Sequence, residues 1–377
     1  MKKNKKAIVN DRNYGIDLLR VVSMFFVVLL HSYGQGGLLN NPNLTSSNYR
    51  LALIMEIIAY CAVDVFALIS GYVSYKEIEK LDEKRLSKYL NLWLQVVFYG
   101  LLVNVAYDIF GNNSLSVKDY LKVIFPVTNG LYWYFTAYTG LYLFIPIINR
   151  GIRNTSEKEL NKMFIIIILL FSIFETYIYR FNINGGYTFI WLVLLYIMGA
   201  IMKKNKIGEK IKGWQAFLGI IVLVIITYLY KEFNINFSIF DIKCGDSVLI
   251  KYTSPTIVLI SILYIVLFLK IKFNNLFKKL IKFAAPSAFC IYILNTQRIF
   301  WNKIMFNLFS KLATESTIKV AIYTILFSIT FCIASILVDK VRMFIFKVLK
   351  INKFTEKINI YTNKLFKVNW KKLYIKL

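Results

Sequence analysis

The segment "IDLLRVVSMFFVVLLHSYGQGG", residues 16–37, contains an apolar run long enough to cross a lipid bilayer. It carries Arg20 near one end and, further along, His31, which is the only histidine in the 377 residues. Titratable side chains are costly inside a bilayer and usually face a cavity or a partner. We therefore expect a membrane-spanning helix that carries functional groups.

Comparable apolar runs recur along the chain. Hydrophobic residues make up 58% and aromatic residues 17% of the sequence. The runs are about 18 to 22 residues long, which matches a transmembrane helix, and they are too continuous for the alternating strands of a membrane barrel. The sequence therefore predicts an all-α, polytopic membrane protein with about ten transmembrane helices. The predicted spans are 16–33, 51–73, 90–110, 131–149, 162–180, 187–202, 214–232, 252–270, 284–300 and 318–339.

The net charge of +27 would also suit a nucleic-acid-binding protein, but the positions of the charges argue against it. Most Lys and Arg residues lie in alternate loops and in the C-terminal tail, and such residues stay on the cytoplasmic side of the membrane. The pattern predicts that both termini are cytoplasmic and that the basic groups face anionic lipids rather than nucleic acid. Together with the richness in Lys, Asn, Ile and Tyr, it indicates the cytoplasmic (plasma) membrane of a bacterium.

The chain divides into three parts. Residues 1–15 form a basic cytoplasmic N-terminus, residues 16–340 a transmembrane domain, and residues 341–377 a basic amphipathic cytoplasmic tail, for which a disordered tail is the alternative. No cleavage site follows His31, so the first span is interpreted as retained rather than as a secretory signal. A single histidine and four scattered cysteines predict no metal site, no disulfide framework and no bound cofactor.

The first span places Asp17, Arg20 and His31 on one helical face. Arg20 and His31 differ by about 20° around the helix and by about 16 Å along its axis. A neutral imidazole in a sheltered cavity accepts a proton near neutral pH, which makes His31 a candidate general base. The alternatives are that Arg20 snorkels to the headgroups and that His31 makes a structural interhelical hydrogen bond.

The second span contributes two carboxylates, Glu56 and Asp64. Glu56 lies about as far from its outer end as His31 does from its own, so we expect the two at one depth. A carboxylate hydrogen-bonded to an imidazole fixes its tautomer and raises its basicity. Glu56 is therefore the candidate orienting residue, and the alternative is that it pairs with another buried group. Asp64 lies deeper, near the middle of the membrane.

Lys84, Arg85 and Lys88 would line one flank of a helix at the inner membrane surface. Together with Arg20 they are candidates for binding phosphate groups. The alternative is the ordinary excess of positive charge in cytoplasmic loops.

Three residues are candidates for contacting an acceptor molecule at the outer side. Trp133 and Tyr134 suit stacking on a sugar, although aromatic residues at this depth also form interfacial belts. Asn295 lies toward the outer end of the ninth span, where an interhelical hydrogen bond is the alternative.

Several segments resemble the membrane acyltransferase-3 family. The first-span segment has the family's Arg and His separated by ten residues, and the second-span segment resembles its Asp–Phe–Ser–Gly–Tyr signature. The opening of the first span is closest to surface-polysaccharide O-acyltransferases. The segments are "DLLRVVSMFFVVLLH" (17–31), "VDVFALISGY" (63–72), "LYWYFTAYTGLYLFIP" (131–146), "GGYTFIWLVLLYIMGA" (185–200) and "SAFCIYIL" (287–294).

The resemblance implies ten spans and an enzyme that transfers an acyl group, usually acetyl from acetyl-CoA, to a sugar hydroxyl. The acceptor would be a cell-surface polysaccharide or its lipid-linked precursor. The family's essential residues correspond to His31 and Arg20, and its second-span acid corresponds to Asp64.

Two positions depart from the family pattern. An Arg-x-x-Arg pattern reads Arg85-Leu86-Ser87-Lys88 here, and Lys lacks the planar fork with which Arg grips phosphate. Many relatives have a histidine where this chain has Asn295. All proton transfer would then rest on His31.

Two other classes fit parts of the pattern. A transporter or flippase for polysaccharides or lipid-linked sugars would share the topology, but it does not need a histidine aligned with an arginine. The other membrane-bound O-acyltransferase fold has its histidine in a late span, whereas the one histidine of this chain lies in the first span. The sequence leaves three alternatives open. The acyl chain is acetyl or succinyl, the transfer is direct or passes through a covalent acyl-His intermediate, and the oligomeric state is not defined.

Overall fold

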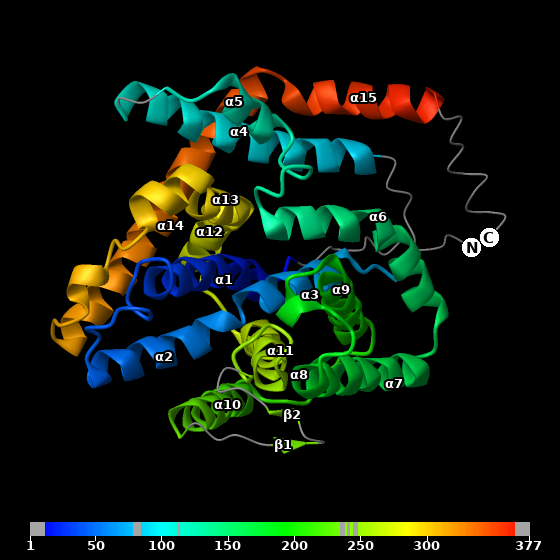
Figure 1. The fold of residues 1–377 in the computed structure, drawn as a ribbon. Helices are drawn as coiled ribbons and strands as arrows, with labels where there is room; N and C mark the ends of the chain where they lie inside the picture. The colour runs from blue at the N-terminus through cyan, green and yellow to red at the C-terminus, as the bar shows by residue number, and fades with distance from the viewer. Residues whose placement is uncertain are drawn as a thin grey trace.

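The computed structural model describes residues 12–77, 84–111, 114–233, 238–239, 242–243 and 248–365, which form a bundle of helices (Figure 1). Its α-helices are α1 (Tyr14–Tyr33), α2 (Ser46–Tyr60), α3 (Ala62–Ser74), α4 (Arg85–Phe110), α5 (Val117–Ile124), α6 (Trp133–Asn154), α7 (Glu157–Ile167), α8 (Glu175–Ile178), α9 (Phe189–Lys204), α10 (Gly213–Glu232), α11 (Pro255–Lys270), α12 (Asn275–Ala284), α13 (Ala288–Thr296), α14 (Thr317–Val348) and α15 (Ile351–Leu365).

Shorter elements join these helices. Two are π-helical, η1 (Ile168–Phe174) and η4 (Phe300–Met305), and three are 3₁₀ turns, η2 (Asn184–Gly186), η3 (Ala285–Ser287) and η5 (Ser310–Leu312). The strands β1 (Ser238–Ile239) and β2 (Ile242–Lys243) pair antiparallel in a small hairpin.

Six helical segments within the described residues are long and apolar enough to cross a membrane. They are Tyr14–Tyr33, Ser46–Ser74, Arg85–Phe110, Glu157–Ile178, Gly213–Glu232 and Thr317–Val348, and Pro255–Lys270 is a shorter apolar helix. The structure therefore confirms a helical fold with several candidate spans. The count of ten and the cytoplasmic position of both termini stay predictions.

Each of the ten predicted spans contains helix, but three of them are not single regular helices. The second divides into α2 and α3 at Cys61, and the fifth passes through the π-helical turn η1 between α7 and α8. The ninth begins nine residues early as α12, is interrupted by η3 at Pro286, and ends as α13 at Thr296. Proline lacks a backbone N–H, which explains the interruption at Pro286.

Polar side chains define where the helices begin. The side chain of Asn13 accepts a hydrogen bond from the backbone N–H of Ile16 at the start of α1, at 3.0 Å. Thr45 and Thr188 cap α2 and α9 in the same way, and Ser116 with Asp119 forms a capping box on α5. Each cap satisfies backbone donors that the first turn of a helix leaves without a partner.

The centre of the bundle is built around α1 and around the close contact of α3 with α9. Helix α1 contacts α2, α3, α11, α13 and α14. Gly71 of α3 and Gly199 of α9 let the two backbones approach closely, since a Cβ on Gly199 would lie 2.0 Å from the carbonyl oxygen of Leu68. Small residues at such crossings are typical of helix packing in membranes. This packing fixes the position of α3 relative to α9.

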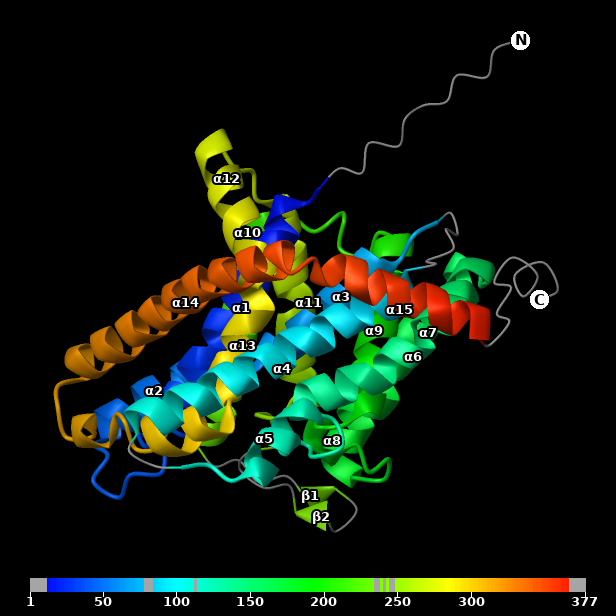
Figure 2. The ribbon, with the colours of Figure 1, turned by 90° about the horizontal axis from the view of Figure 1, so that it is seen from above.

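The described part of the C-terminal region is helical. Helix α14 continues to Val348, past the predicted boundary at residue 340, and α15 then packs along α4 (Figure 2). Thr355 of α15 is buried, and its hydroxyl lies 2.9 Å from that of Ser87 on α4. Residues 1–11 and 366–377, with most of the predicted basic N-terminus and the end of the tail, lie outside the described residues.

Candidate active site

Helix α1 carries the charged and titratable residues of the first span as expected. Nη1 of Arg20 donates to Oδ1 of Asp17 at 3.2 Å, and the guanidinium of Arg12 binds the other carboxylate oxygen. His31 lies three turns further along the helix and is half-buried. Met24 and Val27 lie between Arg20 and His31 on the same side of α1.

The imidazole of His31 has a specific polar partner on α13. Its Nδ1 donates to Oδ1 of Asn295 at 2.5 Å, and Asn295 is completely buried. Because an amide oxygen only accepts hydrogen bonds, this contact requires the proton of neutral His31 on Nδ1. Nε2 then carries the lone pair that can accept a proton. The Nδ2 group of Asn295 is buried and has no hydrogen-bond partner among the described residues.

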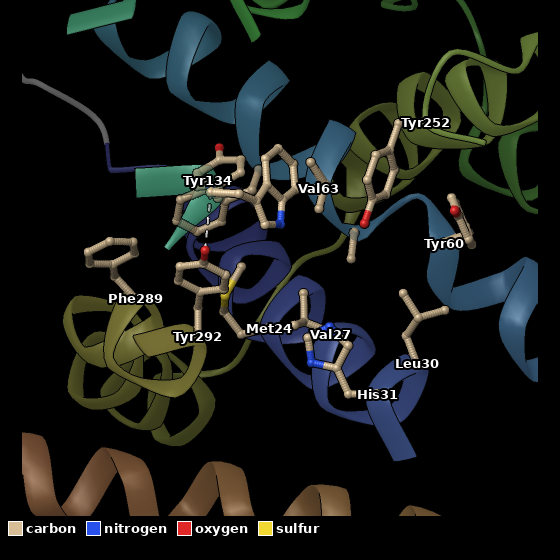
Figure 3. A pocket seen from close by; sticks show the side chains of 13 residues that line it. Met24, Val27, Leu30, His31, Tyr60, Val63, Tyr134, Tyr252, Phe289 and Tyr292 are labelled. Carbon is tan, nitrogen blue, oxygen red and sulfur yellow. Dashed lines mark hydrogen bonds between the residues drawn. The ribbon is translucent and has the colours of Figure 1, made fainter. Parts of the chain in front are cut away.

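A cavity lies in front of His31 and is walled mainly by aromatic rings (Figure 3). Its volume is about 30 Å³, which is room for about two water molecules. The cavity suits reacting groups rather than a complete sugar. The residues that line it are Met24, Val27, Leu30, His31, Tyr60, Ala62, Val63, Phe66, Trp133, Tyr134, Tyr252, Phe289 and Tyr292.

The expected pairing of Glu56 with His31 is not found. Asn295 occupies the position next to Nδ1, whereas Glu56 does not line the cavity and interacts electrostatically with Lys231 of α10. Equal depth fixes only one coordinate of a side chain, and α2 presents Glu56 toward a different neighbour. The contact with Nδ1 that we expected from Glu56 is made by Asn295, which we expected to contact the acceptor.

Asp64 also lies away from the imidazole. It is completely buried, and its Oδ1 accepts a hydrogen bond from Nε1 of Trp191 on α9 at 3.0 Å. Its Oδ2 has no partner among the described residues. Asp64 thus links α3 to α9 behind the cavity wall, which Ala62, Val63 and Phe66 of the same helix help to form. Asp64 thus lies beside the site, and its catalytic role stays a prediction.

Arg20 and Arg85 converge at the other end of the α1 face. Both interact electrostatically with the hydroxyl of Tyr138 on α6. The guanidinium of Arg85 lies over the ring of Tyr142, with 4.8 Å between Cζ and the ring centroid, and the hydroxyl of Tyr142 donates to the carbonyl oxygen of Arg85 at 2.9 Å. Two arginines from distant parts of the sequence therefore share one region, and Tyr138 and Tyr142 are neighbours that the sequence did not reveal.

The two lysines of the predicted phosphate-binding group lie at the start of α4, near Arg85 in the sequence. Nζ of Lys84 donates to Oε1 of Glu356 on α15 at 2.8 Å, and this hydrogen bond raises the pKa of the ammonium group. Lys88 is exposed. Arg85 shares the neighbour Tyr138 with Arg20.

Trp133 and Tyr134 begin α6 and line the cavity. The ring of Trp133 stacks with that of Tyr252 at a centroid distance of 5.9 Å, and the backbone N–H of Tyr134 donates to the hydroxyl of Tyr292 at 3.3 Å. Tyr252, Tyr292 and Tyr60 were missed because aromatic residues at span ends look alike whether they face lipid or a cavity. Groups of His, Cys, Asp and Glu side chains are the usual ligand groups of metal sites. Within the described ranges, no three His, Cys, Asp or Glu side chains form a group that could hold a metal ion.

Fold and site together define a multi-pass membrane protein with a histidine–asparagine pair at an aromatic cavity. Arg20 lies about 16 Å from His31 along α1, and Arg85 of α4 shares with it the neighbour Tyr138. The comparison with protein families gives this class its name. The family described as an acyltransferase domain, Acyl_transf_3, matches residues 13–339, so the chain belongs to the acyltransferase-3 family. No curated protein and no solved structure matches the chain significantly.

Proposed function

We propose that the protein transfers an acyl group, most simply acetyl, from acyl-CoA to a hydroxyl of a cell-surface polysaccharide or its lipid-linked precursor. In this proposal His31 acts as the general base. The protein lies in the plasma membrane of a bacterium, with both of its termini in the cytoplasm. Membership in the acyltransferase-3 family supports the reaction class. The observation that carries the mechanism is the bond from His31 to Asn295, which leaves Nε2 available at the cavity.

The proposed reaction needs one base and returns its proton at the end. Nε2 of His31 takes the proton of the acceptor hydroxyl while the hydroxyl oxygen attacks the thioester carbonyl carbon. The tetrahedral intermediate then collapses, the carbon–sulfur bond breaks, and the CoA thiolate leaves with the proton from Nε2. Asn295 keeps the Nδ1 proton in place throughout, so the imidazole cycles between neutral and protonated forms.

Arg20 and Arg85 are the proposed anchor for the phosphate groups of the donor. Guanidinium groups bind phosphate through paired, charge-assisted hydrogen bonds. The separation of about 16 Å between Arg20 and His31 along α1 would be bridged by the flexible arm of the donor, with Met24 and Val27 beneath it. Lys84 and Lys88 would contribute a weaker, longer-range attraction because one is paired with Glu356 and the other is exposed.

The acceptor would approach the cavity from the side of Trp133 and Tyr134. Aromatic rings offer a face for stacking on a sugar ring, and the cavity itself admits only the reacting hydroxyl and the acyl group. The transporter alternative shares the membrane topology but not the family, and the family model supports a membrane acyltransferase.

The proposed function predicts a chemical change in the cell surface. Mass spectrometry of surface glycans from the source organism should show O-acyl groups that disappear when the gene is deleted and return with the wild-type gene. Complementation with the His31→Gln variant, expressed at the same level, should not restore them. Identical glycans from wild-type and deletion strains would contradict the proposal.

The donor site predicts a specific kinetic effect. Arg85→Ala should raise the KM for acetyl-CoA by about 10- to 100-fold, because a charge-assisted hydrogen bond contributes about 1.5–3 kcal/mol. Acyl transfer by membranes that contain the protein, measured against acetyl-CoA concentration, gives this value. Lys162→Ala, at an exposed lysine of α7, is the control and should leave KM unchanged. An unchanged KM for both variants would assign Arg85 to topology alone.

A further inference from the structure

His31 has a second neighbour, Trp301, which has no role in the proposed reaction. The indole of Trp301 meets the imidazole edge to face, with ring centroids 4.6 Å apart and ring planes at 89°. Trp301 does not line the cavity. The imidazole therefore has two contacts, one from Nδ1 to Asn295 and one between its ring and the indole of Trp301. Neither Asn295 nor Trp301 lines the cavity.

Trp301 is itself fixed by hydrogen bonds on both sides. It belongs to the π-helical turn η4, and its backbone N–H donates to the carbonyl oxygen of Gln297 at 2.8 Å. Its carbonyl oxygen accepts from Nε2 of Gln35 at 3.2 Å, in the segment that follows α1. Short π-helical turns are rare and frequently lie at functional sites. The turn thus ties the indole to the helix that carries His31.

The side chain of Gln297 sets the start of that turn. Its Oε1 accepts from the backbone N–H groups of Ile299 and Phe300 at 2.7 and 3.1 Å, and its Nε2 donates to Oδ1 of Asn104 on α4 at 3.3 Å. A buried polar chain therefore runs from α4 through Gln297 to the turn that presents Trp301.

We propose that Trp301 is a positioning residue that restricts the imidazole of His31 to the ring orientation in which Nδ1 meets Asn295 and Nε2 faces the cavity. The terminal torsion of a histidine is broad and roughly two-fold, so one hydrogen bond leaves the ring free to rock about it. An edge-to-face contact on the ring removes that freedom. The inference rests on the proposed function only for its catalytic consequence, because the ring orientation is a property of the resting protein.

The single histidine makes the orientation directly measurable. With ring-¹⁵N-histidine incorporated and a purification tag free of histidine, the only ring signals come from His31. Wild type should show one signal pair, with Nδ1 protonated and Nε2 unprotonated. Trp301→Leu should give a second pair or exchange-broadened signals, whereas Trp301→Phe should retain one pair, because its ring preserves an edge-to-face contact.

The catalytic rates of the same variants should change in parallel with their ring signals. Trp301→Leu should lower kcat per folded protein by about 3- to 10-fold, the scale of a lost aromatic pair, and leave the KM for acetyl-CoA unchanged. Trp301→Phe should restore most of kcat. The control is Trp214→Leu, at a tryptophan of α10 that is 62% exposed, which should match wild type in both measurements.

Two outcomes would overturn the inference. One is an unchanged ring signal pair in Trp301→Leu, and the other is a loss of kcat that Trp301→Phe does not rescue. If Trp301→Leu does not fold, Gln35→Ala removes the bond to the carbonyl oxygen of Trp301 and is read in the same way. If wild type transfers no acyl group but the ring signals respond as described, the proposed function fails and the positioning of His31 stands.

Discussion

Acyl transfer by the His31→Gln variant is expected to fall by about 10²- to 10⁴-fold, the usual contribution of a general base. No other histidine can substitute for it, and neither Glu56 nor Asp64 lines the cavity. Glutamine has a similar length and can still contact Asn295 through its amide, but it cannot accept a proton near neutral pH. The amount of folded protein should therefore change little while the chemical step is lost.

The measurement is transfer of labelled acetyl from acetyl-CoA in membranes, normalised to folded protein. Ser32→Ala is the matched control on the next residue, because the hydroxyl of Ser32 bonds the carbonyl oxygen of Val28 within α1 and does not reach the cavity. It should retain activity within about two-fold. Activity of His31→Gln within a few-fold of wild type would make the proposed mechanism wrong and favour transport.

The helices were predictable from the sequence because apolar runs of membrane length have few alternative structures. Their interruptions were harder to predict. The division of the second span at Cys61 and the π-helical turn η1 have no proline or glycine to signal them, whereas Pro286 in the ninth span gives a chemical reason for η3. Caps such as Asn13 become visible only once the first helical residue is known.

The relative positions of the candidate site residues were predictable within one helix but not between helices. Arg20 and His31 lie along one face of α1 because helical geometry fixes their relation. The partner of His31 depended on which helix packs against that face, and depth alone did not distinguish Glu56 on α2 from Asn295 on α13. Trp301 was invisible for a further reason, since a π-helical turn changes the register on which any face prediction relies.

The Gly199→Val variant is expected to lose folded protein. A Cβ on Gly199 would lie 2.0 Å from the carbonyl oxygen of Leu68, and one on Gly71 would lie 1.9 Å from that of Tyr196. The obstructing atoms belong to the backbone, so α3 and α9 must move apart, and overpacking of this kind costs about 3 kcal/mol at the upper end of its usual range. Separation would also weaken the bond from Trp191 to Asp64.

Thermal unfolding in detergent should therefore show a clear drop in Tm for Gly199→Val, and the activity that survives should fall further than the folded fraction, because α3 supplies part of the cavity wall. Gly151→Ala is the matched control. A Cβ at Gly151 meets nothing within 4 Å, and replacing a helical glycine by alanine stabilises a helix by about 1 kcal/mol at most. Its Tm should equal or slightly exceed that of wild type. An unchanged Tm for Gly199→Val would mean that α3 and α9 are not in backbone contact, and the wall of the cavity in front of His31 would then have to be built differently.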